Sequence, residues 1–270
     1  MDHVEKYLPI VETLAAKALD LAINASPTKP REGEHVRSLM EWVPAAKALL
    51  SGESVGIDYL PTLEAIRDGT RVRFRDGRGH SRPHYLYLAA GLHRAGLGVH
   101  PVGLARDAGV VSCAGDELGD AFELPWLSNA VNDQFDMSRD WLDMEVGALE
   151  SDTPMHPPDV DTTPDEWTFA EMGALHGLFN AAIAIGHDAG LAKAHAAARY
   201  HLQHTQPDYT TYQPWALAAF LYFPDTVGFA EQQLHDVETH LHVEGPPGAL
   251  VPGLLLADAV ATLREAAKRD

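Results

Sequence analysis

The sequence predicts an all-α protein, and three observations support this. Apolar residues recur at three- and four-residue intervals along most of the chain, which is the period of an amphipathic helix. Proline often stands at the start of such a segment, where its missing N–H costs nothing. Strand patterns are nearly absent. The one clear alternation, Arg71 to Arg75 before Asp76-Gly77, fits a short hairpin arm or an irregular loop.

The helical pattern can be followed along the chain in order. It covers residues 8–25, 36–50, 84–95, 126–146, 167–185, 191–202, 215–223, 229–241 and 254–267. Thr163 and Glu166 form a capping box, which places a helix start at Pro164. From there we predict helices at 164–186, 188–204, 213–223, 226–242 and 252–268, with short turns that favour antiparallel neighbours.

The domain organisation is predicted to be a single helical domain over residues 1–270. Residues 151–163 are acidic and rich in proline, so they cannot form a packed core element. We interpret them as a long surface loop or a linker between two helical halves. Prolines at helix starts recur at steps of about 35 to 50 residues, which matches one helical hairpin per step. The members of this series are Pro9, Pro44, Pro83, Pro125, Pro164, Pro214 and Pro252.

Composition excludes several classes of function. The net charge of −19 repels phosphate groups, so nucleic acid and anionic membranes are not expected partners. The single cysteine, Cys113, excludes an internal disulfide and a cysteine-based zinc cluster. No apolar run is long enough to span a membrane, and the first residues lack the pattern of a signal peptide. We therefore expect a cytoplasmic protein.

The polar connection at residues 199–215 is the first candidate site. A polar, aromatic turn between two apolar helices is where a helical protein commonly presents side chains to a ligand. His201 and His204 stand three residues apart near a helix end, so their rings can point the same way. The alternative is a histidine-rich helix end followed by a turn whose aromatic rings pack on the core. The candidate catalytic residues are His201, His204, Asp208, Tyr209 and Tyr212, with Trp215 as an apolar wall.

His176 and Asn180 are the second candidate, for ligand binding. They stand one turn apart on the 164–186 helix, which is apolar around most of its circumference and is therefore expected to be central. Together with Glu171 they can supply polar groups inside a cavity. The alternative is a core histidine satisfied by Asn180 or by a backbone carbonyl. His93, in a similar helix, has the same two interpretations.

An arginine patch is the third candidate. Six of the 14 arginines fall within residues 67–82. In an acidic chain such a patch can recognise a phosphate, a carboxylate or an acidic partner, and Arg73 and Arg75 are the candidate ligand-binding residues. Pairing with carboxylates of this chain or of a second subunit is the alternative.

Acidic side chains at helical spacing raise the question of a metal site. Residues 116–120 and 132–140 resemble the paired Mg²⁺ motifs of class I terpene synthases. They stand too close together, however, and the second has aspartates where that family has a hydroxyl and a glutamate. A further stripe could bind a transition metal only with ligands from a facing helix. Solvated helix faces explain these patterns better, so no metal site is predicted, and the cofactor is left open. The stripe consists of Glu231, His235, Glu238 and His242.

The succession of helical hairpins resembles the α/α-toroid architecture over about residues 80–270. That class includes terpenoid cyclases, protein prenyltransferases and glycan-processing enzymes. The resemblance implies a ligand site at one mouth of an inner helix ring, lined here by residues 206–215. The chain contains none of the usual phosphate-loop, hydrolase or metalloprotease motifs. The fold class expected is thus successive antiparallel hairpins in a toroid or solenoid-like array.

Two hypotheses about function follow. The first is an enzyme or small-molecule-binding protein whose cavity is lined by the 201–215 turn and the 164–186 helix. The second is a non-catalytic helical-repeat scaffold that holds another protein. The oligomeric state is left open, because apolar helix faces can belong to the core or to an interface.

Overall fold

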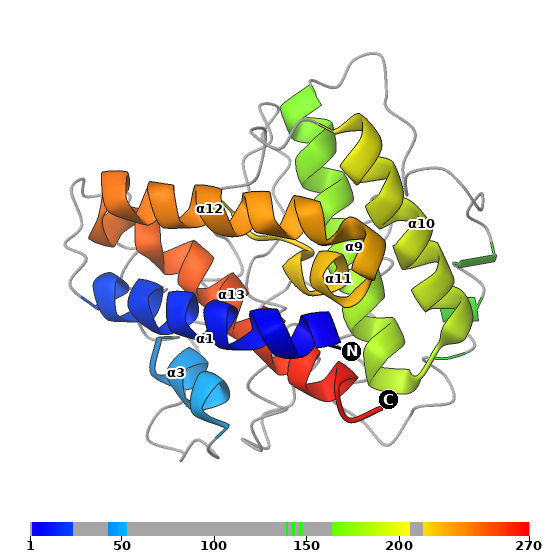
Figure 1. Cartoon of the computed structure of the whole chain (residues 1–270), viewed down its shortest axis with the longest axis horizontal. Helices are drawn as coiled ribbons and strands as arrows, with labels where there is room; N and C mark the ends of the chain where they lie inside the picture. The colour runs from blue at the N-terminus through cyan, green and yellow to red at the C-terminus, as the bar shows by residue number, and fades with distance from the viewer. Residues whose placement is uncertain are drawn as a thin grey trace, which may run out of the picture.

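The computed structural model describes residues 2–23, 43–52, 139, 142–143, 146–147, 164–205 and 213–269. Every regular element in these ranges is a helix, so the predicted all-α class is confirmed there (Figure 1). The elements are α1 (Asp2–Ala22), α3 (Val43–Ser51), α9 (Pro164–Ile185), α10 (Asp188–His204), α11 (Leu217–Tyr222), the short 3-10 helix η4 (Pro224–Thr226), α12 (Val227–Glu244) and α13 (Pro246–Ala266). The predicted alternation at 71–77, the helix at 84–95 and the linker at 151–163 lie outside the described residues.

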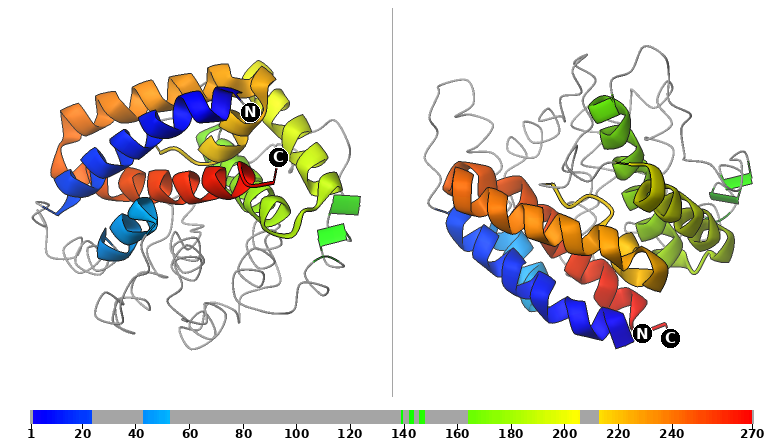
Figure 2. Two further views of the ribbon diagram at one scale, coloured as in Figure 1. Left: turned by 60° about the horizontal axis from the view of Figure 1, so that its bottom comes forward. Right: turned by 45° about the horizontal axis from the view of Figure 1, so that its top comes forward.

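Three long helices form one side of the described fold. α13 contacts both α1 and α12 and runs antiparallel to both (Figures 1 and 2). α1 packs closely along α13, and α3 packs across these two helices. Small side chains allow the close approach, because a Cβ atom on Gly253 would lie only 3.2 Å from the backbone nitrogen of Leu19.

α9 and α10 form an antiparallel hairpin joined by Gly186 and His187. Gly186 has a φ of 68°, a conformation that glycine adopts readily at the end of a helix. Arg139 Nη2 donates to the carbonyl of Ile185 at 2.7 Å and so satisfies one of the last acceptors of α9. His187 caps α10, because its Nδ1 accepts from the N–H of Gly190 at 2.8 Å.

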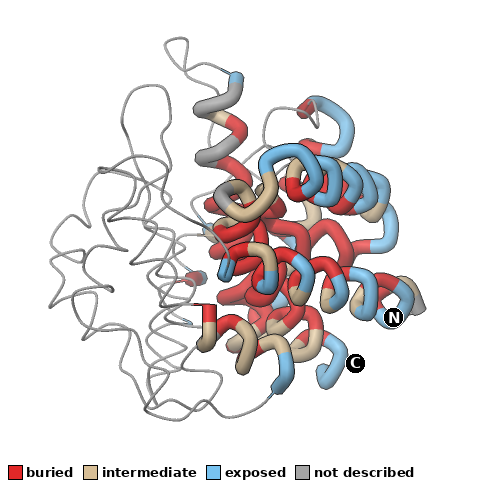
Figure 3. Tube along the Cα trace, turned by 90° about the vertical axis from the view of Figure 1, so that its left-hand side faces the viewer, coloured by how far each residue is buried: buried red, intermediate tan, exposed pale blue. Residues whose placement is uncertain are grey.

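α11 is the central element and contacts α1, α9, α10, α12 and α13. Its residues from Leu217 to Leu221 are all buried. Residues 171–183 of α9 are buried without a break, as predicted for a central helix. Figure 3 shows this buried core, with exposed positions mainly on the outer faces of the helices. The stripe predicted on α12 is exposed at all four positions, as expected of an amphipathic helix.

The proline series marks helix starts at only some of its described members, and Pro83 and Pro125 lie outside the described residues. Pro44 and Pro164 stand at the beginning of α3 and α9, but Pro9 and Pro252 lie inside α1 and α13. α13 begins earlier, at Pro246, because Gly245 ends α12 with a φ of 63° and a ψ of −147° that glycine tolerates best. A proline inside a helix loses one backbone hydrogen bond. Extensive burial of α13 offsets this loss.

The segment after Pro214 also differs from the prediction. The expected helix at 213–223 begins only at Leu217, because Ala216 adopts a left-handed conformation that a right-handed helix cannot include. Pro214 and Trp215 therefore belong to a turn, and this turn brings backbone groups next to α9.

Candidate functional site

A polar cluster lies in the core where α9, α13 and the turn before α11 meet. His176 and Asn180 come from α9, and Asp258 comes from α13. Each of these residues is 1% exposed. Polar and ionisable groups withdrawn from water need partners, so the contacts among them decide what the cluster can do.

Asp258 joins the cluster through one carboxylate oxygen. Its Oδ2 lies 2.9 Å from His176 Nε2 and accepts a hydrogen bond from Asn180 Nδ2 at 3.0 Å. The two nitrogens themselves lie 3.0 Å apart. Two N–H donors thus converge on a single acceptor, which is an arrangement suited to a carboxylate.

The opposite ring nitrogen of His176 is held by the backbone. Ala216 N–H donates to His176 Nδ1 at 3.3 Å. A backbone N–H can only donate, so Nδ1 carries the lone pair and the ring proton resides on Nε2, facing Asp258. The imidazole is therefore neutral, with both nitrogens engaged by the protein. Trp215 packs edge-on against it, with ring centroids 5.2 Å apart.

The turn that supplies the Ala216 N–H is strained. Ala216 has a φ of 56° and a ψ of 13°, and the described residues include no other non-glycine residue with a positive φ. This conformation costs an L-residue about 1–2 kcal/mol. Neighbouring side chains hold it in place: Gln233 Nε2 donates to the Trp215 carbonyl at 2.8 Å, and Trp215 Nε1 donates to Gln213 Oε1 at 3.3 Å. Backbone strain of this kind is concentrated at functional sites.

Two buried oxygens of the cluster accept no hydrogen bond, namely Asn180 Oδ1 and Asp258 Oδ1. They belong to the two groups that the 3.0 Å hydrogen bond joins. Gln233 Oε1, beside the turn, also has no partner. A buried polar group without a partner costs about 1–3 kcal/mol. A bound molecule that carries hydrogen-bond donors would satisfy the two cluster oxygens.

His201 belongs to a different buried pair. Its Nε2 lies 3.2 Å from Glu171 Oε2, and its Nδ1 lies 2.7 Å from Thr205 Oγ1. His201 and Glu171 are fully buried, and the ring of Trp167 lies 5.6 Å from that of His201. The pair fastens the end of α10 to α9. Glu171, which the sequence associates with His176, thus has His201 as its partner.

Of the remaining predicted site residues, the structure describes only His204. His204 is exposed at the end of α10, with its ring 4.6 Å from that of Tyr200. The other candidates lie outside the described residues: Asp208, Tyr209, Tyr212, Arg73 and Arg75.

Of the predicted residues, His176, Asn180 and Trp215 come together, and Asp258 is the partner that sequence reasoning missed. Asp258 stands alone in the apolar run Leu254 to Val260. A polar residue in an otherwise apolar helix is also what singles out His176 in α9, so the sequence did contain a signal for Asp258. The Ala216 N–H had no such signal, because a left-handed alanine looks like any other alanine in a sequence.

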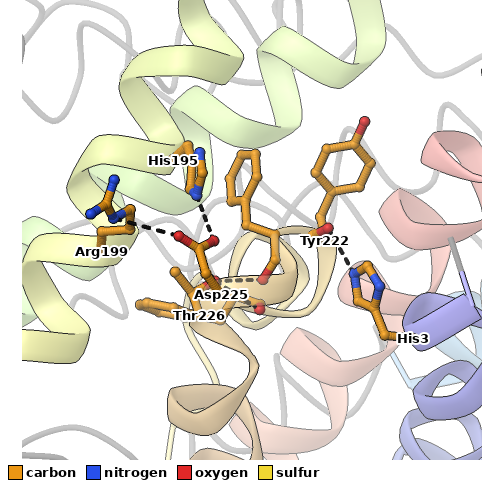
Figure 4. Close-up of polar contacts among 8 residues, drawn as sticks. His3, His195, Arg199, Tyr222, Asp225 and Thr226 are labelled. Carbon is orange, nitrogen blue, oxygen red and sulfur yellow. Dashed lines mark hydrogen bonds and ion pairs between the residues drawn. The ribbon is translucent and has the colours of Figure 1, made fainter.

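A second carboxylate–histidine pair lies at the surface (Figure 4). His195 Nε2 lies 2.6 Å from Asp225 Oδ1, and Arg199 Nε lies 3.5 Å from Asp225 Oδ2. Partial burial of Asp225 acts to raise its pKa. The hydrogen bond and charge of His195, together with the charge of Arg199, outweigh burial and lower that pKa. Solvent reaches all three side chains, so this is an ordinary ion pair that joins α10 to η4.

Comparisons with protein-family models, with curated proteins and with solved structures give no match. No helix in the described ranges is long and apolar enough to cross a membrane. The part of the chain that the structure describes also contains no group of three or more His, Cys, Asp or Glu side chains that could hold a metal ion. The motifs that resemble terpene synthases lie outside this part, apart from Arg139.

Proposed function

We propose that this protein binds a small molecule at the buried cluster of His176, Asn180 and Asp258. The observation that carries the proposal is a pair of acceptors in one cluster, Asn180 Oδ1 and Asp258 Oδ1, which are buried without a donor and belong to hydrogen-bonded side chains. Native proteins leave few such atoms, and a bound molecule or ordered water commonly satisfies them. The strained turn at Ala216 supports the same conclusion, because it holds His176 in a fixed orientation.

The same contacts favour binding over acid–base catalysis. A general base needs a ring nitrogen within reach of the substrate proton. Both nitrogens of His176 are engaged, one by Asp258 and the other by the N–H of Ala216. His176 therefore acts as a positioning residue that orients Asp258.

The scaffold hypothesis stays a prediction. It would use a groove, the acidic surface or the arginine patch at residues 67–82, and that patch lies outside the described ranges. For the architecture, we propose that the hairpins α9–α10 and α12–α13 are units of a toroid or solenoid-like array. An experimental structure of the whole chain tests that arrangement.

Native mass spectrometry of untagged protein, purified gently, tests the proposed function. We expect wild-type protein to carry an added noncovalent mass that Asn180→Leu loses, because leucine has a similar shape but no amide. In parallel, the protein is unfolded and refolded to remove any bound molecule, and three small probes are then added separately: methylammonium, acetamide and acetate. At least one should raise the unfolding midpoint of wild type and not that of Asn180→Leu.

Thr168→Val is the matched control. Thr168 Oγ1 is another buried oxygen of α9 without a partner, and it stands eight residues, or about 12 Å, before His176. This variant should keep the bound mass and the response to the probes. No added mass together with no response to any probe would overturn the proposal. An equal response in Asn180→Leu would overturn the location of the site.

A further inference from the structure

Among the residues that the structure describes, no lysine or arginine balances the charge of the cluster. His176 is neutral, because its Nδ1 accepts from the N–H of Ala216. Asp258 Oδ2 accepts from His176 and Asn180, as a carboxylate does. Within the described ranges, no lysine or arginine pairs with Asp258. A buried carboxylate that has only neutral partners is costly, so a cation is the group that would stabilise it most.

The free atoms of the cluster define the donors that such a cation must carry. Asn180 Oδ1 and Asp258 Oδ1 are both acceptors, and neither has a donor. An anion or an acceptor-only molecule would be repelled there. A neutral donor would satisfy the two oxygens but would leave the charge of Asp258 uncompensated.

We infer that the ligand is a small organic cation, a protonated amine or a guanidinium group, whose N–H groups donate to Asn180 Oδ1 and Asp258 Oδ1. The inference rests on the proposed function, since it names the chemical class of the molecule bound at that site. A primary ammonium has three N–H donors, and a guanidinium presents several in one plane. Charge-assisted hydrogen bonds of this kind are roughly twice as strong as neutral ones.

A metal ion fits this cluster less well. The two free oxygens are few ligands for a hard cation, which prefers six or more in the case of Ca²⁺. An ammonium or guanidinium needs only directed acceptors, and the two hydrogen-bonded side chains each offer one, Asn180 Oδ1 and Asp258 Oδ1.

Thermal unfolding in chloride salts of matched concentration tests the inference. Methylammonium at about ten times its Kd should raise the unfolding midpoint by about 2–3 °C. Tetramethylammonium carries the same charge but no N–H donor and should have no such effect. If potassium or tetramethylammonium acts as strongly as methylammonium, the requirement for N–H donors is wrong.

Asp258→Asn removes the charge with little change in shape. It should weaken methylammonium binding at least about tenfold. Asp225→Asn is the matched control, because it removes another aspartate that contacts a histidine, and it should leave binding unchanged. If Asp258→Asn does not fold, Asn180→Ala removes one acceptor and keeps the carboxylate, and it should weaken binding by about tenfold. Unchanged binding in a folded variant overturns the inference.

The outcomes separate this inference from the proposed function. If acetamide or acetate binds at the cluster and methylammonium does not, the site exists but its ligand is not a cation. If none of the three probes acts and no mass co-purifies, both proposals fail. The comparison of methylammonium with tetramethylammonium uses only wild-type protein. It therefore tests whether the ligand must carry N–H donors even where every variant unfolds.

Discussion

Ala216 shows how a single residue links backbone strain to the cluster. Its left-handed conformation directs its N–H to His176 Nδ1 and so fixes the tautomer that faces Asp258. Nothing in the sequence could indicate this, because alanine usually favours a helix. His176 and Asn180 were predictable, since they are polar positions on an otherwise apolar helix. His201 was also singled out, but its partner Glu171 depends on how α9 and α10 pack.

Ala216→Gly should stabilise the protein. Glycine adopts the left-handed conformation without the Cβ penalty, although it also makes the unfolded chain more flexible. We expect a net increase of about 0.5–1 kcal/mol in the free energy of unfolding, measured with urea. Ala218→Gly, in the helical part of α11, is the control and should lower that free energy by about 1 kcal/mol or more. Destabilisation by both variants would show that Ala216 is not strained.

At the scale of elements, helix periodicity was a better guide than proline position, which was correct for Pro44 and Pro164 but not for Pro9 and Pro252. The α10 bounds agree with the predicted 188–204, and α9 ends one residue before the predicted limit, because both have clear signals at their ends. Pro252 was misleading, since a proline can stand inside a helix whose burial compensates for one lost hydrogen bond. The start of α13 is set instead by Gly245, whose backbone conformation the sequence alone does not reveal.

Gly253→Ala should destabilise the protein through the contact between α13 and α1. An added Cβ would lie 3.1 Å from Leu19 Cδ2, 3.2 Å from Ala18 Cβ and 3.2 Å from the Leu19 backbone nitrogen. The backbone atom cannot move without shifting α1, so overpacking should cost about 1–3 kcal/mol in urea unfolding. Gly228→Ala in α12 is the control. The nearest atom to its added Cβ is 3.9 Å away, so it should be neutral or slightly stabilising. Equal effects of the two changes would exclude close packing as the cause.

At the scale of the whole molecule, the fold class could be predicted from the sequence, but the arrangement of the helices could not. The all-α class was predictable because it depends on periodicity, which is local. Which helices become neighbours was not, because α1 and α13 come from opposite ends of the chain and still pack along each other. The buried cluster depends on such long-range packing, since Asp258 is 78 residues from Asn180.

The net charge of −19 predicts that salt stabilises the folded protein. Like charges repel each other more in the compact state than in the unfolded chain, and salt screens that repulsion. Raising NaCl from about 0.01 M to about 0.3 M at pH 7 should increase the free energy of unfolding in urea by roughly 1 kcal/mol. The same titration near pH 5.5 should give a smaller increase, because protonated histidines reduce the net negative charge. Surface ion pairs act in the opposite direction, for example Arg264 Nη2 with Glu12 Oε1 at 2.7 Å. A loss of stability with salt at pH 7 would therefore show that such pairs outweigh the repulsion of the acidic surface.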